Sequence, residues 1–193
     1  LDYARGAYQQ GADALIVQDL GLAAKVAQSI PELPLHISTQ MNIHDRYGVE
    51  ACAALGVERI TLARELTLAE VADLCEHASQ FGIEVEVFAH GALCVCYSGQ
   101  CFMSSMIGGR SANRGLCAQA CRLPYELYDS ASPDSPKKAE GEFLLSPKDL
   151  CTADMLPQLA EAGAASLKIE GRMKSPEYVS SAVSVYRAVL DRM

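Results

Sequence analysis

Short runs of aliphatic residues alternate with longer amphipathic segments along most of the chain. The aliphatic runs predict strands over residues 14–17, 35–39, 59–63, 84–89, 143–145 and 166–169. The amphipathic segments predict helices over residues 2–10, 21–29, 43–55, 68–80, 147–161 and from 176 onward. Strands that alternate with helices across short connections are typical of a parallel sheet with helices packed outside it, so the pattern predicts an α/β fold.

Local start signals support several of these helices. Asn42 is placed to cap the helix over 43–55, and Thr67 with Glu70 matches the capping box, in which each side chain accepts from a free backbone N–H. Ser146-Pro147 and Ser175-Pro176 each place a capping serine before a proline at the first helical position.

The repeated strand–helix unit indicates a partial TIM-barrel-like (β/α) fold. A complete barrel has eight units in about 250 residues, whereas six candidate strands occur in these 193 residues and the chain opens with Leu1 inside a helix. We therefore expect a fragment that forms a single barrel domain over residues 1–193, with its N-terminal βα units missing. A smaller open α/β sheet is the structural alternative.

Two stretches interrupt the alternation. Residues 90–125 form an insertion rich in Cys, Gly, Ser and Arg, and residues 129–141 have the Ser, Pro and Asp content of a flexible surface loop. Long connections inside a compact domain are usually functional. The insertion is therefore where we expect the chemistry.

Composition narrows the class of protein. Hydrophobic residues make up 50% of the chain and charged residues 21%, as in an ordinary globular protein. The net charge of −8 argues against broad, non-specific nucleic-acid binding, which needs phosphate neutralisation by Lys and Arg. No apolar run is long enough to span a membrane and no secretory signal is visible, so a cytoplasmic protein is expected.

Cysteines concentrate in the insertion: five of the eight lie between positions 94 and 121. Cys52, Cys75 and Cys151 fall in helical-looking stretches and are expected to be buried thiols. From residue 87 to residue 125 there is no Asp or Glu, while three arginines are present: Arg110, Arg114 and Arg122. The cysteine-bearing segment is thus cationic, which would stabilise a negatively charged metal centre.

Four thiolates can close a tetrahedral zinc site or hold a [4Fe–4S] cluster. The candidates are spaced as Cys94-x6-Cys101-x15-Cys117-x3-Cys121. This spacing matches neither a zinc ribbon nor a ferredoxin, so iron–sulfur, zinc and structural thiols or disulfides all remain open. Cys96 competes with Cys94 as the first ligand, because alternate residues of an extended segment face the same side.

Several motifs together resemble a known family. They are residues 86–94 (EVFAHGALC), 97–105 (YSGQCFMSS), 113–125 (NRGLCAQACRLPY), 145–150 (LSPKDL) and 167–178 (LKIEGRMKSPEY). The chain resembles the peptidase U32 family of collagenase-like proteases over nearly its whole length. Within that family it is most similar to the RNA base hydroxylase branch, in particular to the large ribosomal-RNA cytidine hydroxylase-like members.

The resemblance implies a TIM-barrel-like core and an oxygen-sensitive [4Fe–4S] cluster on Cys94, Cys101, Cys117 and Cys121, with Cys96 as an extra thiol. It also implies RNA, either rRNA or tRNA, as the substrate and prephenate as a co-substrate. Some relatives act as paired subunits in quinone hydroxylation. One alternative function is therefore that of a non-catalytic or paired subunit that binds a protein partner.

Catalytic candidates lie where strands end, because that edge carries the active site in barrel enzymes. They are Glu86, His90, Lys168, Glu170 and Arg172, and each has a structural alternative as an ion pair, packed side chain or helix entry. The three arginines of the insertion are candidate cofactor-binding residues. Other candidates at this edge are Gln40, Asn42, Arg64, Glu65, Ser146 and Lys148.

Proteolysis is the second alternative function. The chain has neither an HExxH zinc motif nor a GxSxG nucleophile elbow. A dyad of Cys94 and His90 would be the remaining route, because a thiolate beside an imidazolium is nucleophilic.

Overall fold

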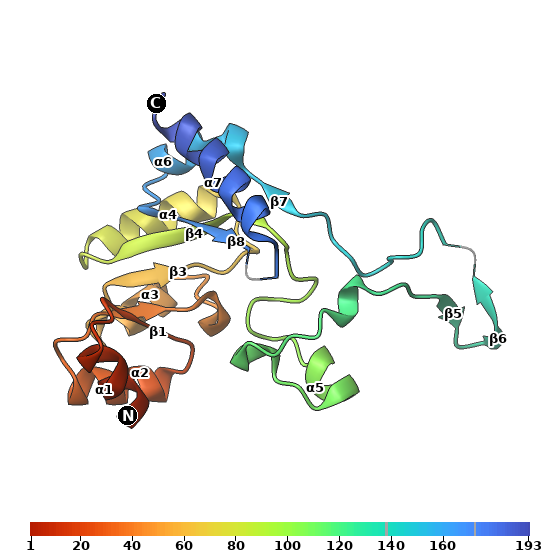
Figure 1. Cartoon of the computed structure of the whole chain (residues 1–193), viewed down its shortest axis with the longest axis horizontal. Coiled ribbons are helices and arrows are strands. Elements are labelled where there is room, and N and C mark those ends of the chain that lie inside the picture. Colours follow the sequence, from red (N-terminus) through yellow and green to blue (C-terminus); the bar gives the residue numbers. More distant parts are fainter. Residues whose placement is uncertain (138, 172) are drawn as a thin grey trace.

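The computed structural model describes residues 1–137, 139–171 and 173–193, so Lys138 and the catalytic candidate Arg172 lie outside the described residues. Figure 1 shows a body of sheet and helices from which one hairpin projects. The strands are β1 (Leu15–Val17), β2 (Leu35–Ile37), β3 (Arg59–Thr61), β4 (Glu84–Gly91), β5 (Leu127–Asp129), β6 (Ser132–Lys137), β7 (Leu150–Cys151) and β8 (Ser166–Glu170). The α-helices are α1 (Asp2–Gln9), α2 (Leu20–Ser29), α3 (Arg46–Ala53), α4 (Leu68–Ser79), α5 (Met103–Gly108), α6 (Leu156–Glu161) and α7 (Pro176–Leu190). Short 3-10 helices are η1 (Thr39–Met41), η2 (Ala112–Arg114), η3 (Ala120–Arg122) and η4 (Ala153–Met155).

The main sheet is mostly parallel. β1, β2, β3, β4 and β8 lie side by side in that order, each parallel to its neighbour. β7 pairs antiparallel with the last two residues of β4. Because β8 occupies one edge of β4, β7 must continue the other edge beyond the end of β3. The predicted α/β class is confirmed, but the described strands form an open sheet and do not close into a barrel.

The two faces of the sheet differ in chemistry. On one face Ile37, Ile60 and Val85 are fully buried and belong to the same core as residues of the covering helices, such as Val26 and Leu74. Burial of each large aliphatic side chain stabilises the fold by roughly 1.5–3 kcal/mol. Burial alternates along β4: Val85, Val87, Ala89 and Gly91 are buried, whereas Glu84 is exposed and Glu86, Phe88 and His90 are part-buried. The opposite face is therefore left for polar groups.

Two helix starts agree with the sequence and one does not. Thr67 and Glu70 form the predicted capping box of α4, and Ser175 caps α7. The predicted start of the third helix at Asn42 was wrong. α3 begins at Arg46, because the Asp45 carboxylate accepts from the backbone N–H of Gly48 at 2.7 Å. Asn42 has a left-handed backbone (φ 59°) and instead ends η1.

The segment from 143 to 161 also differs from its prediction. Residues 143–145 form no strand, and the helix over 147–161 is reduced to η4 and α6. Ser146 does not cap a helix, because its hydroxyl accepts from Arg122 at 2.7 Å. The chain then enters β7, whose Cys151 is exposed instead of buried in a helix as expected.

The predicted flexible loop over 129–141 contains most of a hairpin. β5 and β6 pair antiparallel, and the Lys137 ammonium lies 2.7 Å from the Asp129 carboxylate. All six residues of β6 are exposed, and the hairpin projects away from the main sheet (Figure 1). Composition correctly indicated a surface segment but not its regular pairing.

A β-bulge interrupts β4 at Ala89. The register with β8 shifts between Phe88 and His90, so Ala89 has no partner on that strand. Its carbonyl instead accepts three hydrogen bonds: from the Tyr186 hydroxyl at 2.6 Å, from the Thr152 hydroxyl at 3.0 Å and from the Thr152 backbone N–H at 3.0 Å. The bulge is thus fixed by α7 and by the segment after β7.

Removal of the Tyr186 hydroxyl tests this arrangement. We expect Tyr186→Phe to lower the free energy of unfolding by about 1 kcal/mol, because one of three donors to a buried carbonyl is lost. Tyr178→Phe is the matched control: Tyr178 lies on the same helix, and in the described part of the chain its hydroxyl makes no hydrogen bond. Urea unfolding of both variants measures the difference, and equal losses would contradict the assignment.

Candidate functional site

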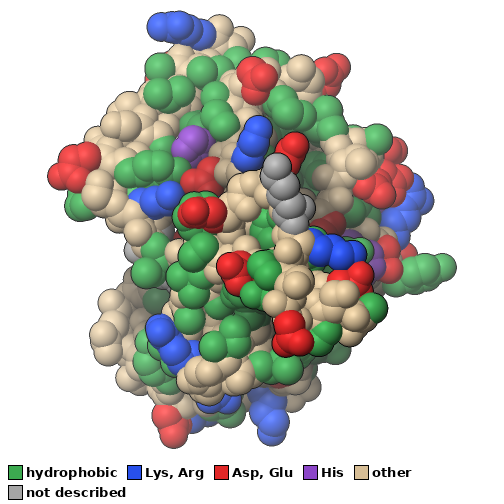
Figure 2. Space-filling model, turned by 90° about the vertical axis from the view of Figure 1, so that its right-hand side faces the viewer, with side chains coloured by type: hydrophobic (Ala, Val, Ile, Leu, Met, Phe, Trp, Pro, Cys, Tyr) green, Lys and Arg blue, Asp and Glu red, His purple; other side chains and the backbone are tan. Residues whose placement is uncertain are grey.

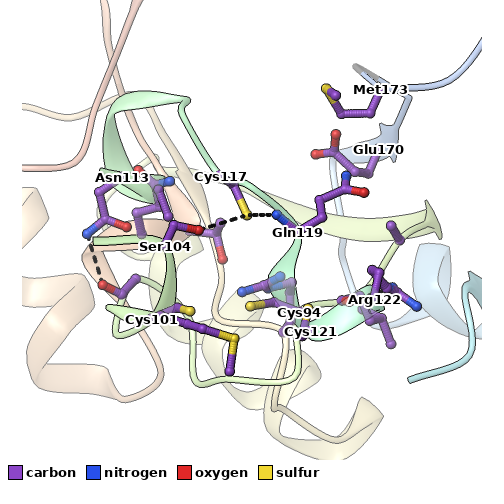
Figure 3. Close-up of a pocket in the computed structure, with 18 of the residues that line it drawn as sticks. Cys94, Cys101, Ser104, Asn113, Cys117, Gln119, Cys121, Arg122, Glu170 and Met173 are labelled. Atoms are coloured by element: carbon purple, nitrogen blue, oxygen red, sulfur yellow. Dashed lines mark hydrogen bonds between the residues drawn. The ribbon is translucent and has the colours of Figure 1, made fainter. Parts of the chain in front are cut away.

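A cavity of about 210 Å³ lies at the carboxyl ends of the parallel strands. Gln40 follows β2, Arg64 follows β3, Phe88 belongs to β4 and Glu170 ends β8, and all four line it. Most of the remaining wall comes from the insertion between β4 and β5, and Thr39, Met173 and Lys174 complete it (Figure 3). Ligands of open α/β sheets bind outside this edge of the strands, so the cavity is the candidate site.

All four predicted cysteine ligands line this cavity. Cys94 follows β4, Cys101 precedes α5, Cys117 lies between η2 and η3, and Cys121 is part of η3. Figure 3 shows them distributed along the cavity wall. Cys96 is not among the lining residues, but it lies near enough to Cys101 to raise the pKa of that thiol, so Cys94 as the first member of the set stays a prediction.

Backbone N–H groups are directed at three of the four sulfurs. The N–H of Gln119 donates to Cys117 Sγ at 3.4 Å, and those of Met103 and Val95 donate to the sulfurs of Cys101 and Cys121. The Ser104 hydroxyl also lies 4.0 Å from Cys117 Sγ. Hydrogen bonds of this kind stabilise thiolates and tune the potential of iron–sulfur clusters.

The thiols also influence one another. Burial raises the pKa of Cys101 and of Cys121, and the neighbouring Cys94 and Cys117 raise it further through charge repulsion. For Cys121 the nearby Arg122 guanidinium acts in the opposite direction. Several thiolates in one small space repel each other. A cation between them relieves this repulsion, and metal binding both requires and stabilises the deprotonated form of each thiol.

Four thiols of this kind are chemically suited to either of the two metal centres considered, zinc or a [4Fe–4S] cluster. A zinc ion needs four thiolates about 2.3 Å from one point. Among the described residues, no three His, Cys, Asp or Glu side chains are grouped so as to hold a metal ion. A [4Fe–4S] cluster also takes four thiolates but is a larger body that would occupy the space between the cavity walls. The cysteines fit it by number, chemical kind and shared cavity, without forming a preassembled ligand cage.

Arg122 differs from the other two arginines of the insertion. Its guanidinium donates to the Leu93 carbonyl at 2.8 Å, to the Ser146 hydroxyl and to the Pro147 carbonyl, and it pairs with Asp149 at 3.5 Å. It lines the cavity and also ties the start of the insertion to the chain before β7. Its role here is structural as well as electrostatic.

Arg110 and Arg114 are exposed and do not line the cavity. The surface around them is not uniformly basic, because Phe102, Met106 and Ile107 are exposed beside them in the sequence. Figure 2, viewed from the side that carries the hairpin, shows hydrophobic side chains between separate charged groups. As cofactor-binding residues, these two arginines therefore remain a prediction without a contact to the cavity.

Glu86 lies at the centre of a polar network on the open face of the sheet. Its carboxylate accepts from the Thr61 hydroxyl at 2.8 Å on β3 and from the Ser166 hydroxyl at 2.8 Å on β8. It also pairs with Lys168 at 3.0 Å. Burial opposes ionisation of Glu86, but these hydrogen bonds and the Lys168 charge outweigh it, so the pKa of Glu86 is lowered. The carboxylate holds three strands together in its ionised form.

For Lys168, the structural alternative was an ion pair, and Lys168 does form one across strands. Lys168 pairs with Glu86 on the neighbouring strand, and its ammonium also lies 5.8 Å from the centre of the Phe88 ring. Glu170 lies two residues further on, at the cavity wall. The cross-strand pair makes a structural role the better interpretation for Glu86 and Lys168, whereas Glu170 faces the site itself.

His90 is packed between two tyrosine rings instead of facing the cysteines. Its ring centre lies 5.7 Å from that of Tyr178 and 5.5 Å from that of Tyr186, and its Nδ1 is 3.5 Å from the Tyr186 hydroxyl. It does not line the cavity, and in the described residues it makes no hydrogen bond to Cys94. The Cys94–His90 dyad is therefore not assembled.

Other residues of the site were not singled out from the sequence, including Thr39, Phe88, Ser98, Ser104 and Asn113. Ser98 is a buried polar residue in an irregular turn, and Ser104 is the buried polar residue of the short helix α5; no periodic pattern reveals either of them. Gln40 and Arg64, both expected at this edge, do line the cavity, whereas Asn42, Ser146 and Lys148 do not.

A pH series tests the Glu86 network. We expect Glu86→Gln to lower the free energy of unfolding by about 1–3 kcal/mol near neutral pH, because charge-assisted hydrogen bonds across three strands are lost. The folded-state pKa lies below the ordinary value of 4.5, so this stabilisation is complete above 4.5 and is lost as the pH falls through the folded-state pKa.

Urea unfolding at about pH 7 and about pH 3.5 measures the free energy of unfolding of Glu86→Gln and of a control variant, Glu84→Gln. Glu84→Gln is the control on the same strand, because among the described residues the Glu84 side chain pairs only with Arg59, in an exposed ion pair. This substitution should cost well under about 1 kcal/mol. A Glu86→Gln deficit that does not shrink in acid would argue against an ionised Glu86.

The fold and the site together define an α/β protein with a thiol-lined cavity at the carboxyl ends of its parallel strands. Comparison with known sequences then gives the family. The profile described as Peptidase family U32 matches residues 1–193, and the chain belongs to this family.

Individual relatives carry two kinds of name. The chain is 37% identical over 193 residues to the tRNA hydroxylation protein P1 of Bacillus subtilis (strain 168), covering 98% of this chain and 45% of that protein. It is 44% identical over 185 residues to the 23S rRNA 5-hydroxycytidine C2501 synthase of Escherichia coli (strain K12), covering 95% and 27%. It is 34% identical over 186 residues to a collagenase of Porphyromonas gingivalis (strain ATCC BAA-308 / W83), covering 92% and 44%. The chain thus spans between about a quarter and a half of each of these relatives.

Proposed function

We propose that this chain forms the cluster-binding part of an enzyme that hydroxylates a base in RNA, either tRNA or rRNA. The observation that carries the proposal is that Cys94, Cys101, Cys117 and Cys121 line one cavity at the strand ends. It is supported by similarity to relatives named for tRNA hydroxylation and for 5-hydroxycytidine synthesis. Action on RNA would place the protein in the cytoplasm. Among the described residues, no helix is both long and apolar enough to cross a membrane.

The proposed architecture is an arc of a TIM-like barrel. The parallel order of β1, β2, β3, β4 and β8 with helices against one face is the arrangement of such a barrel. The polar face, with Glu86 and Lys168 paired across strands, corresponds to the barrel interior, where charged groups need a partner. The cavity then lies at the barrel mouth.

The proposed cofactor is a [4Fe–4S] cluster bound by the four cavity cysteines. When bound, it would supply one-electron chemistry within the cavity. The chain's own residues hold the thiolates: Arg122 fixes the segment around Leu93, and the N–H groups of Met103, Gln119 and Val95 donate to three of the sulfurs. Arg122 also lowers the pKa of its neighbour Cys121, although burial dominates.

Arg64 is the residue we assign to the co-substrate. Its Nε donates to Ser98 and its guanidinium lies 5.7 Å from the centre of the Phe88 ring at the cavity wall. A guanidinium in this position suits a small carboxylate, such as the prephenate that we propose as co-substrate.

RNA contact is proposed for Arg110 and Arg114. Both are exposed on a segment without acidic residues, in a chain that is otherwise acidic. Two such cations position phosphates but provide little affinity alone. Further contacts would come from another subunit or from segments like those that the relatives have in addition.

Metal analysis tests the ligand set. After anaerobic purification we expect about four iron and four acid-labile sulfide per chain, because a cubane contains four of each. Alanine at any of the four cavity cysteines should remove most of both, whereas Cys151→Ala and Cys96→Ala should retain them. One zinc per chain without sulfide would support the zinc alternative and contradict the cluster.

Nucleoside analysis tests the activity. Cells that lack the gene should lose a hydroxylated nucleoside from tRNA or rRNA, measured by mass spectrometry of digested RNA. The wild-type gene and Cys151→Ala should restore it, and Cys117→Ala should not. If the full set of hydroxylated nucleosides persists without the gene, RNA hydroxylation is excluded. Gelatin cleavage that survives Cys101→Ala would then favour the peptidase alternative.

A further inference from the structure

The turn between Cys94 and Cys101 contains the most deeply buried polar residue of the insertion. Ser98 is 0% exposed, although it belongs to no helix or strand. A buried hydroxyl and a buried N–H each need a partner, because loss of hydration is otherwise uncompensated. The partners of Ser98 come from outside the insertion.

Glu65, just after β3, supplies the main partner. Its carboxylate accepts from the Ser98 backbone N–H at 2.6 Å, and both of its oxygens lie 3.1 Å from the Ser98 hydroxyl. One side chain thus serves both polar groups of a single residue 33 positions away. Hydrogen bonds to an ionised acceptor are roughly twice as strong as neutral ones.

The Ser98 oxygen in turn accepts from Arg64. The Arg64 backbone N–H and its Nε both lie 3.2 Å from Ser98 Oγ. The Thr39 hydroxyl lies 3.3 Å from the same oxygen but only 2.9 Å from the Leu62 carbonyl. Because a hydroxyl has one hydrogen, Thr39 serves Leu62, and Ser98 then has one donor and two acceptor positions in use. The hydrogen-bonding positions of the Ser98 hydroxyl are thus filled by Glu65 and Arg64, which belong to the segment after β3.

Gly99, the next residue, determines how closely the turn approaches the segment after β2. Gly99 has φ +74°, and a Cβ on it would lie 2.0 Å from the Gln40 carbonyl oxygen. Only glycine allows the turn to lie this close to the segment after β2. From the other side, the Asn113 side chain donates to the Gly99 carbonyl at 3.0 Å. The turn is thus held at both neighbouring residues, 98 and 99.

We propose that Glu65 is a positioning residue that docks the turn of residues 97–100 on the sheet and thereby sets Cys94 and Cys101 at the cavity wall before any metal is bound. The same hydrogen-bond cluster orients Arg64 toward the cavity. The proposal rests on the four-cysteine site proposed above, but it concerns the metal-free chain. It implies that half of the ligand set is preorganised by a carboxylate that contacts no sulfur.

Glu70 provides a matched control on the same part of the chain. Its carboxylate accepts from the backbone N–H and the hydroxyl of Thr67, both at 2.7 Å, so it makes the same chemical contacts as Glu65. Those contacts cap α4 and involve no residue of the insertion. Each of the variants Glu65→Gln and Glu70→Gln therefore removes one charge and weakens the same kind of hydrogen bonds. Only Glu65→Gln affects the contacts of the turn.

The experiment measures alkylation of individual cysteines in the reduced, metal-free chain. Mass spectrometry follows the iodoacetamide rate of each thiol. We expect Glu65→Gln to raise the rates of Cys94 and Cys101 about tenfold, because the turn opens more often when its anchor is weakened. The rates of Cys117 and Cys121 should change by less than about twofold, and Glu70→Gln should leave all four near wild type.

Hydrogen exchange of residues 96–101 provides a second measurement, with faster exchange expected in Glu65→Gln but not in Glu70→Gln. Gly99→Ala reaches the same turn by an independent route, through contact with the Gln40 carbonyl, and should reproduce the pattern. Uniform changes at all four cysteines, or equal effects of Glu65→Gln and Glu70→Gln, would overturn the proposal. Absence of iron in the purified protein would contradict the proposed cofactor without affecting this result.

Discussion

The arrangement of the site depends on how strand β4 leaves the sheet. β4 is paired along both edges, yet the cysteine insertion begins directly after it. The extra residue at Ala89 and the three hydrogen bonds to its carbonyl fix the twist of the strand at this point. At Gly91 a Cβ would lie 2.2 Å from the Glu170 carbonyl, so only glycine lets the chain pass β8 and turn toward the cavity.

Two kinds of stabilisation meet at this edge. The sheet and its helices are held by aliphatic burial, whereas the insertion contributes a single buried hydrophobic residue, Ala120. Polar contacts hold the insertion instead: Ser98 to Glu65, Asn113 to Gly99, and Arg122 to the chain before β7. Such contacts allow local opening more readily than a packed core does. A site of this construction can admit a bulky inorganic group while the sheet beneath it stays folded.

Sequence patterns captured the elements but not their junctions. Outside residues 143–161, strands with period-two or continuous aliphatic runs, and the helices that begin at the Thr67–Glu70 capping box and at Ser175-Pro176, were predicted within a few residues. The prediction for residues 143–161 was wrong. There the helix-start signal Ser146-Pro147 is overridden by hydrogen bonds from Arg122, which belongs to a distant segment. Clustering and spacing gave the four candidate cysteines but left zinc and iron–sulfur open, and the family resemblance alone implied a [4Fe–4S] cluster. Ser98 and the pairing of Lys168 with Glu86 depend on strand register and loop docking, which no local pattern encodes.

The projecting hairpin combines exposure with features that limit strand addition. A solitary pair of strands offers unpaired N–H and C=O groups to any passing extended chain. β6 contains Pro133 and Pro136, which have no N–H to offer, and Lys137 carries a charge at its end. Such a strand cannot present a continuous row of donors. The hairpin can therefore project into solvent with little tendency to nucleate edge-to-edge aggregation between copies of the protein.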